Sequence, residues 1–493
     1  MKKINLIIIM ILTIGNIYAQ NVDDALRYSQ IFYSGTARFI SMGSAFTALG
    51  GDLSTLSQNP AGIGVLRSSE VTISPQLFHI KTKANFNGIS EDYLYNFNLG
   101  QAGVVTNLIS KNNQTGLINL NFGYSYNRTN NYNTSVRIEG VQNSSSMADY
   151  WADISSGINY RNLGGAAGIA YDAWIIDTIT GTGPGYYYGT VFSNYGDNPP
   201  SVYGQRIRRI ITNEGYSGEH AFSIGGNISN KIFFGATLGI NRLSFTGHYE
   251  HLEDADYPLI SGFRNFIYTD HYENTGTGFS FKLGTIVKPT EYIRVGFAFH
   301  SPVYYKIDEY FYDNISSNFE GNDHYEFSND AMRYNYALTT PFRAMGGIAV
   351  QIKKIGLLSA EYEFVDYATA RFSETGDGYD YSEKNLEIKN TLKSTGNLRL
   401  GGELRLDKFY LRGGYGYYGK AFKQGEDNED LDYKSVTFGA GFREKNISID
   451  FGFAGFWNPQ KYILYTSEAG NSIANMNTAR NTFTLSVGYK FGY

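Results

Sequence analysis

The sequence predicts an all-β protein, a transmembrane outer-membrane β-barrel of about 14 antiparallel strands with an N-terminal hatch (plug) inside the lumen. From Val71 onward, strand-like runs alternate apolar and polar residues with period two. Short and long connections between these runs also alternate. The composition agrees, because 16% aromatic residues and 56 glycines accompany only 18% charged residues, below the roughly 25% of soluble domains. A mean hydropathy of −0.31 excludes a bundle of membrane helices.

The first 19 residues have the pattern of a secretory signal peptide. Lys2 and Lys3 form a basic start, residues 6–14 are apolar, and Ile17-Tyr18-Ala19 provides a cleavage site before Gln20. We therefore predict three segments: a leader at 1–19, a hatch at 20–70 and a barrel at 71–493.

The stretch 42–66 is the predicted heart of the hatch. It is rich in small residues, and Asp52 is its only ionised group. It ends in Asn59-Pro60-Ala61-Gly62, where the proline favours a turn and the two small residues allow close backbone contact. A small, nearly uncharged segment that ends in a turn is suited to packing inside another structure.

Residues 35–77 resemble the N-terminal hatch of the FadL-type outer-membrane transporters of hydrophobic compounds. The matching residues are Gly43, Ala45, Phe46, Thr47, Ala48, Asp52, Asn59, Pro60, Ala61 and Gly62. The position of this motif, just after a leader and just before the first strand, adds to the resemblance.

The barrel strands are read from the alternation. The expected strands are 71–87, 93–108, 116–130, 219–229, 232–249, 265–288, 291–311, 337–353, 356–372, 389–406, 408–420, 433–444, 446–457 and 481–493. In the last of them, Phe483, Leu485, Val487, Tyr489, Phe491 and Tyr493 share one face. This aromatic chain end resembles the signal that the outer-membrane assembly machinery recognises, so we expect that machinery as a partner during biogenesis.

The connections predict which end of the barrel is which. Short turns lie at 111–113, 229–230, 288–290, 353–354, 407–408 and 444–446, and longer polar links lie at 131–218, 250–264, 312–336, 373–388, 421–432 and 458–480. Outer-membrane barrels have short periplasmic turns and long extracellular loops. Both termini are therefore predicted to be periplasmic. The longest link, 131–218, with a short helix near 147–158, is either a cap over the mouth or a mobile loop.

The face opposite the lipid is predicted to carry charges of both signs. The expected lumen residues are Arg294, Arg343, Glu361, Glu363, Arg399, Glu403, Arg405, Arg412, Arg443 and Asp450. Mixed signs favour a paired lattice that holds the hatch, rather than an ion-selective pore or an unpaired, solvated lumen. Gly401, Gly414, Gly439 and Gly452 on the same face would leave room for the hatch.

Other classes of function find little support. The chain has no cysteine and a net charge of −5, which predicts no thiolate chemistry and no binding of nucleic acid. His248 and His251, with Glu250 and Glu253, form a weak metal candidate, and the acidic loop 426–432 lacks EF-hand spacing. We expect no metal, no cofactor and no enzymatic activity.

The resemblance implies passive uptake of hydrophobic small molecules, such as long-chain fatty acids, past the hatch and sideways into the membrane. Expected partners are outer-membrane lipids and the hydrophobic substrate. The candidate pocket residues are Phe46, Leu49, Leu56, Ile63 and Val65. The alternative is a surface shuttle or scaffold of a type IX-like secretion system, which binds protein partners. A continuous apolar pocket between hatch and wall would favour uptake, and a sealed lumen would favour the shuttle.

Overall fold

The computed structural model describes residues 21–111, 115–179, 186–193, 202–255, 262–376 and 378–492. The predicted leader and Tyr493 lie outside these residues. Among them, no helix has the length and apolar character needed to cross a bilayer.

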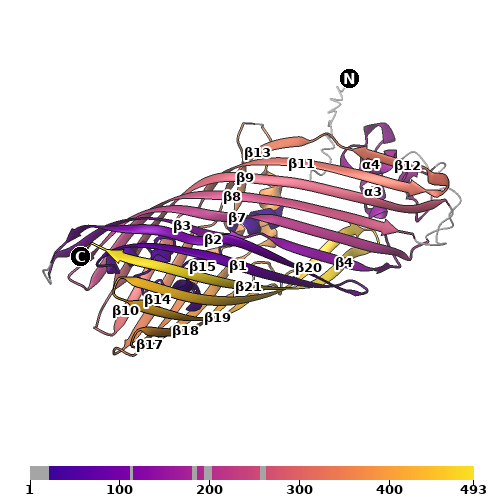
Figure 1. Ribbon diagram of the computed structural model, residues 1–493. Helices are drawn as coiled ribbons and strands as arrows, with labels where there is room; N and C mark the ends of the chain where they lie inside the picture. The colour runs from indigo at the N-terminus through magenta and orange to yellow at the C-terminus, as the bar shows by residue number, and fades with distance from the viewer. Residues whose placement is uncertain are drawn as a thin grey trace, which may run out of the picture.

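A closed antiparallel barrel dominates the structure (Figure 1). Its first strands are β1 (Ser69–Asn85), β2 (Ile89–Ser110), β3 (Leu117–Asn131), β4 (Thr134–Gln142), β7 (Gln205–Ile228), β8 (Ile232–Asp254), β9 (Phe263–Val287), β10 (Ile293–His300) and β11 (Tyr304–Phe319). The remaining strands are β12 (His324–Ser328), β13 (Met332–Thr339), β14 (Arg343–Ile352), β15 (Gly356–Asp366), β16 (Arg371–Glu374), β17 (Ser394–Leu406), β18 (Phe409–Tyr418), β19 (Tyr433–Glu444), β20 (Ile447–Ser467) and β21 (Gly470–Phe491).

The sheet has 14 strand positions, as predicted. Four positions are each built from two successive strands, β3–β4, β10–β11, β13–β14 and β15–β16. The barrel closes because β1 pairs with β21 from Ser69↔Phe491 to Asn85↔Asn475. Pairing of the first strand with the last removes the two free edges that an open sheet would expose to the bilayer, where an unpaired backbone would be costly.

The outer face is apolar, as the alternation predicts. On β21, Phe483, Leu485, Val487, Tyr489 and Phe491 are between 38% and 48% exposed, whereas Thr482, Thr484 and Ser486 are buried. Apolar side chains that remain exposed along a strand face the hydrocarbon core of the bilayer.

The two ends of the barrel differ. The short-turn end carries the tight connections predicted from the sequence and lies where the chain ends (Figure 1). At Ser229 and Asn230 both φ angles are positive, 54° and 55°, which is the geometry of a two-residue hairpin turn. The opposite, loop end carries α3 (Met147–Ser155), α4 (Gly165–Asp172) and the small β5 (Ile176–Thr178) and β6 (Tyr188–Thr190) pair.

Of the two forms expected for the link 131–218, its described residues show the cap, which lies at the loop end. Its helix α3 matches the one expected near 147–158, and its Trp151 is buried against Phe266 and Tyr268 of β9. Ser146 and the backbone of Met147 both donate to Glu253 at 2.6 and 2.7 Å. The cap is therefore tied to the barrel wall by packing and hydrogen bonds.

Several strand predictions were wrong, because the predicted links 131–218 and 312–336 also contain strands, β4 in the first and β12 with parts of β11 and β13 in the second. The link 458–480 is the top of a β20–β21 hairpin, β7 begins at Gln205 instead of 219, and residues 382–391 form helix α5 (Ser382–Thr391) where a strand was expected to begin at 389. Near the loop end, outward positions such as Lys461, Asn475 and Asn477 are polar, so the apolar alternation that marks a strand in the bilayer is absent. Polar hairpins of this kind were mistaken for loops.

Candidate functional site

The N-terminal segment lies inside the barrel, where hatch and wall form the candidate site. It contains α1 (Val22–Ser29), α2 (Ala37–Ser41) and the 3₁₀ helices η1 (Leu53–Ser57) and η2 (Pro60–Val65). Hydrogen bonds join it to strands around the lumen. Gly43 N donates to Thr437 on one side at 3.0 Å, and Asn121 Nδ2 donates to Ile63 O on the other at 2.7 Å.

The Asn59-Pro60-Ala61-Gly62 motif begins η2 and is completely buried. The Asn59 side chain accepts from Ala61 N at 3.1 Å, as a helix cap does, while its amide donates to Thr47 O at 2.6 Å and to Thr285 O of β9 at 3.3 Å. Pro60 occupies the first helical position, where no backbone donor is required. The motif thus joins two parts of the hatch to the wall.

Glycines on the inner face of the wall allow the hatch backbone to touch the strands. A β-carbon at Gly401 would lie 2.3 Å from Met42 O, and one at Gly284 would lie 1.8 Å from Asn59 Oδ1. Equally close approaches to the hatch occur at Gly235, Gly296, Gly414, Gly439 and Gly452. The four glycines expected to make room for the hatch therefore do so.

The substitution Gly401→Ala is expected to destabilise the protein by about 1–3 kcal/mol, because the new methyl group overlaps the Met42 backbone. The measurement is the thermal midpoint of the purified barrel. Gly346→Ala is the control, since its nearest atoms belong to the Phe297 ring at 3.9 Å. Equal midpoints for both variants would contradict the close fit.

A lattice of buried charges connects the wall to the hatch. Arg399 donates to Glu361 at 2.6 Å and to Glu363 at 2.8 Å, and Arg343 also pairs with Glu363. Glu361 in turn accepts from the backbone N–H of Thr47 in the hatch at 2.9 Å. Buried carboxylates of this kind are tolerated only with paired cations and full hydrogen bonding.

A second group of charges surrounds Glu403. This carboxylate accepts from Arg412 at 2.7 Å and from Arg38 of the hatch at 2.9 Å, and Arg412 also binds Asp450 at 2.6 Å. Glu403 and Arg412 lie on the adjacent strands β17 and β18, whereas Asp450 lies on β20, on the far side of β19.

Three of the expected lumen charges differ from this pattern. Arg294 donates to the carbonyl oxygen of Leu49 at 2.7 Å, and Arg443 packs on the Tyr410 ring at 4.8 Å. Arg405 is exposed near the short-turn end and donates to Asp407 O at 3.3 Å. None of the three forms a salt bridge with a carboxylate of the described residues.

The sequence reading missed three lumen residues. Lys282 donates to Glu219 at 2.6 Å and to Ser57 O of the hatch at 2.7 Å, and His300 contacts Gln58 O at 2.7 Å. Lys282 and His300 each lie an even number of residues from buried positions on their own strands. The period-two pattern would therefore have identified them as lumen residues.

The pocket candidates separate into two groups. Phe46, Leu56 and Ile63 are wholly buried in contacts between hatch and wall. Leu49 and Val65 line a cavity at the short-turn end. The candidates therefore do not share one chamber.

Another chamber, of about 310 Å³, lies on the other side of the hatch, toward the loop end. Aromatic rings and amide side chains alternate on its walls, which include Phe32, Tyr132, Phe245, Tyr433, Phe456, Trp457, Gln30, Asn130, Asn131 and Asn458. We call it the upper cavity. A space of about 30 Å³ below it shares Phe32, Phe456 and Arg480 with it and reaches the hatch at Gly43.

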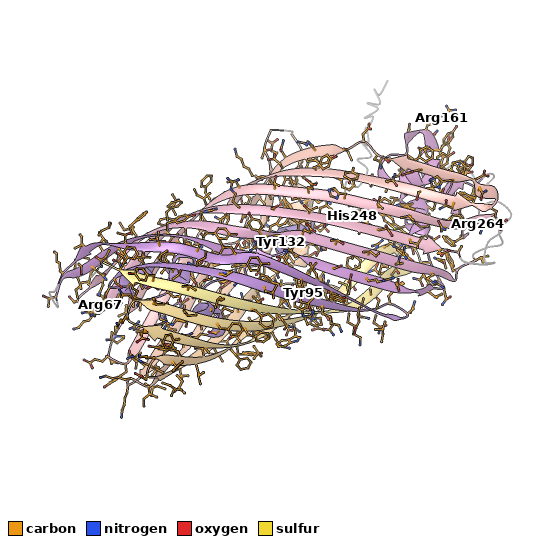
Figure 2. All side chains as sticks on the ribbon, in the orientation of Figure 1. Arg67, Tyr95, Tyr132, Arg161, His248 and Arg264 are labelled. Atoms are coloured by element: carbon orange, nitrogen blue, oxygen red, sulfur yellow. The ribbon has the colours of Figure 1, made fainter. Side chains whose placement is uncertain are left out.

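The wall beside the upper cavity contains a seam. The β2–β3 ladder ends at Gln101↔Asn127, although β2 continues to Ile89. Beyond that point, side-chain bonds bridge β2 and β4, such as Ser135 Oγ to Asp92 at 2.6 Å. Tyr132, at the β3–β4 junction, lines the cavity on the inside, and Tyr95 of β2 is 61% exposed (Figure 2).

The metal candidate at the end of β8 does not assemble. His251 and Glu253 are buried and contact each other at 3.0 Å, whereas His248 is exposed and Glu250 approaches Arg208 at 3.6 Å. Successive residues of a strand point to opposite faces, so His248 and Glu250 lie on one face, His251 and Glu253 lie on the other, and the four side chains cannot surround one ion. Among the described residues no group of three or more potential ligands is present.

Comparison with solved structures supports the barrel fold. A FadL homologue of Pseudomonas aeruginosa is similar with a TM-score of 0.56 and 14% identity, covering 94% of this chain and 100% of that one. The toluene transporter TodX of Pseudomonas putida gives a TM-score of 0.52 at 11% identity, with 94% and 100% covered. Identities this low carry the fold alone. No curated protein sequence matches.

The family comparison concerns the second half of the chain. The sequence model of the family described as outer membrane protein transport protein (OMPP1/FadL/TodX) matches residues 221–491. This range excludes the hatch, so the match is independent of the motif at Asn59. The family consists of outer-membrane transport proteins rather than enzymes. The chain belongs to the OMPP1/FadL/TodX family of outer-membrane transport proteins.

Proposed function

We propose that this protein carries out passive uptake of hydrophobic small molecules, long-chain fatty acids or similar, across the outer membrane. The observation that carries the proposal is the upper cavity, which lies between the hatch and the loop end and borders the seam. Its volume of about 310 Å³ lies within the range of about 300–1,000 Å³ typical of small-molecule sites.

The proposed orientation places the short-turn end in the periplasm. Short connections and the chain end near Phe491 lie there, and the cap lies at the opposite end (Figure 1). In this orientation residues 1–19 are the leader, 20–70 the hatch and 71–493 the barrel. The assembly machinery would act on the chain's aromatic end.

The proposed route has three steps. A solute enters the upper cavity from outside, rearrangement of the hatch opens the 30 Å³ space, and the solute leaves through the seam between β2 and β4 into the membrane. At each step the free energy of an apolar solute is lower than it would be in water. The buried hatch residues Phe46, Leu56 and Ile63 would contact the solute only after the hatch moves, and the charge lattice would fix the resting position of the hatch.

The position of Arg480 favours the proposal that the substrate is an amphiphile with an anionic head group. It borders both cavities, and its guanidinium lies 4.8 Å from the centre of the Phe456 ring and 5.8 Å from that of Phe32 in the hatch. Its Nε is buried without a hydrogen-bond partner among the described residues. A carboxylate at the lower end of the upper cavity would provide this missing acceptor.

The test is uptake in Gram-negative cells that lack their own fatty-acid transporter. We expect the protein to restore uptake of oleate, and Arg480→Gln to reduce it about tenfold per folded barrel, since one charge-assisted hydrogen bond is lost. Uptake of toluene, which has no charge, should change little in that variant. Lys408→Gln is the control, because Lys408 is exposed and pairs with Glu444 at 2.7 Å.

Failure to raise uptake of either solute would contradict the proposal and favour the alternative, a surface shuttle or scaffold. The cap offers exposed aromatic side chains for a protein partner, among them Trp174 at 48% and Tyr187 at 48% exposure. Capture of one defined secreted protein, lost on Trp174→Ala, would support that role.

A further inference from the structure

A second large cavity lies on the opposite side of the hatch, at the short-turn end. Its volume is about 360 Å³. The hatch contributes Arg38 and residues 49–51 and 65–68, and the wall contributes Tyr292, Arg294, Ala349, Val350, Gln351, Leu357 and Lys490. It shares no lining residue with the two cavities above the hatch. We call it the lower cavity.

The lining of the lower cavity is strongly basic. Among the described residues no carboxylate borders it. Four cations do so: Arg38, Arg67, Arg294 and Lys490. Figure 2 shows Arg67 at the end of the barrel opposite Arg161 of the cap. The cations come from three separate parts of the chain, the hatch, β10 and β21, so folding brings them together.

Two of these cations are already matched with carboxylates. Arg38 is bound by Glu403 at 2.9 Å, and Lys490 lies 3.9 Å from Glu70. Arg294 has only a neutral acceptor, the carbonyl oxygen of Leu49 at 2.7 Å.

Arg67 is in the same situation, with Asn230 Oδ1 at 3.1 Å as its acceptor. Neither arginine has a salt-bridge partner in the described part of the chain, in contrast to Arg399 and Arg412, which each have two. A guanidinium has five donors in a planar fork that fits carboxylate and phosphate oxygens. Both side chains therefore retain donors for an anion.

The rest of the lining is apolar. Leu49, Val65, Leu66 and Leu357 border the same space. A cavity with free guanidinium donors on one part of its surface and aliphatic side chains on another matches an ion that also has a hydrocarbon portion. It is larger than a bare phosphate needs.

We propose that the lower cavity is a binding site for the phosphate or carboxylate head group of an anionic amphiphile, held by Arg294 and Arg67. This site is separate from the uptake route, because the hatch lies between the two. The head group could belong to a phospholipid of the adjacent leaflet or to a free amphiphile, since both have the same oxyanion chemistry.

The test is calorimetric titration of the purified, full-length protein in a non-ionic detergent with dodecyl phosphate. The double variant Arg294→Gln, Arg67→Gln should bind at least about tenfold more weakly, because two charged donors are lost. Lys408→Gln, which removes one exposed positive charge at the same end, should bind like the unmodified protein. The same comparison in an Arg480→Gln background removes the head-group contact proposed for the upper cavity, so the binding that remains and depends on Arg294 and Arg67 belongs to the lower cavity.

Further probes identify the source of the anion. Binding of phosphatidylglycerol in nanodiscs, dependent on the same two arginines, supports a lipid, and binding of dodecyl phosphate without it supports a free amphiphile. Equal affinity of the double variant for dodecyl phosphate, or equal binding of the neutral dodecanol, would overturn the proposal. The single variant Arg67→Gln controls for misfolding, because Arg67 is exposed. This variant should weaken binding without changing the thermal midpoint.

Discussion

Replacing Arg399 with methionine is expected to lower the free energy of unfolding by about 3–5 kcal/mol. Arg399 is completely buried, and among the described residues it is the one cation that forms a salt bridge with Glu361. Without it, Glu361 remains buried with no cation, while Glu363 still has Arg343. Because Glu361 also accepts from Thr47, the loss should loosen the hatch as well as the wall.

The measurement is a denaturant titration of the protein in lipid vesicles, followed by the mobility shift of the folded barrel on a gel. Arg137→Met is the matched control, because Arg137 also pairs with a glutamate, Glu139, but its side chain is 47% exposed. Its expected cost is about 0–1 kcal/mol. A further variant, Arg399→Met with Glu361→Gln, should recover part of the loss. If Arg399→Met unfolds at the same denaturant concentration as the control, the lattice does not stabilise the barrel.

The strands in the bilayer could be predicted because lipid and lumen impose opposite chemistry on alternate residues. On β21, Phe483 to Phe491 show the pattern without interruption. The same alternation assigned Arg399 and Glu361 to the lumen correctly. It fails where the wall extends beyond the bilayer, since the outer face of the upper β20–β21 hairpin carries polar residues there, such as Lys461 and Asn475.

The pairing of the charges could not be predicted from the sequence. Whether Glu361 meets Arg399 depends on the register of β15 and β17, which hydrogen bonds across the sheet determine. The hatch contacts were also out of reach, because Thr47 and Glu361 are far apart in the chain. The parity of residues along β8, in contrast, was available, and it would have separated His248 from His251.

The hatch motif provides the second large expected effect. Ala61 is completely buried and packs against Phe233 of β8 and Ile286 of β9. The backbone of the hatch touches the wall at this point, since a β-carbon at Gly235 would lie 2.8 Å from Ala61 N. Ala61→Phe should overpack the contact at a cost of about 1–3 kcal/mol and shift the hatch.

The barrel itself should still assemble with Ala61→Phe, because its closed β1–β21 ladder does not involve the hatch. We therefore expect uptake of a hydrophobic probe, normalised to folded barrel on the gel, to change while the amount of folded barrel does not. Ala440→Phe is the control, since Ala440 is exposed on the outer face of β19 and a larger apolar side chain there meets lipid. If the motif were only a turn leading into β1, Ala61→Phe would either have no effect or reduce assembly and uptake together. An unchanged ratio of uptake to folded barrel would mean that the hatch does not control passage of the solute.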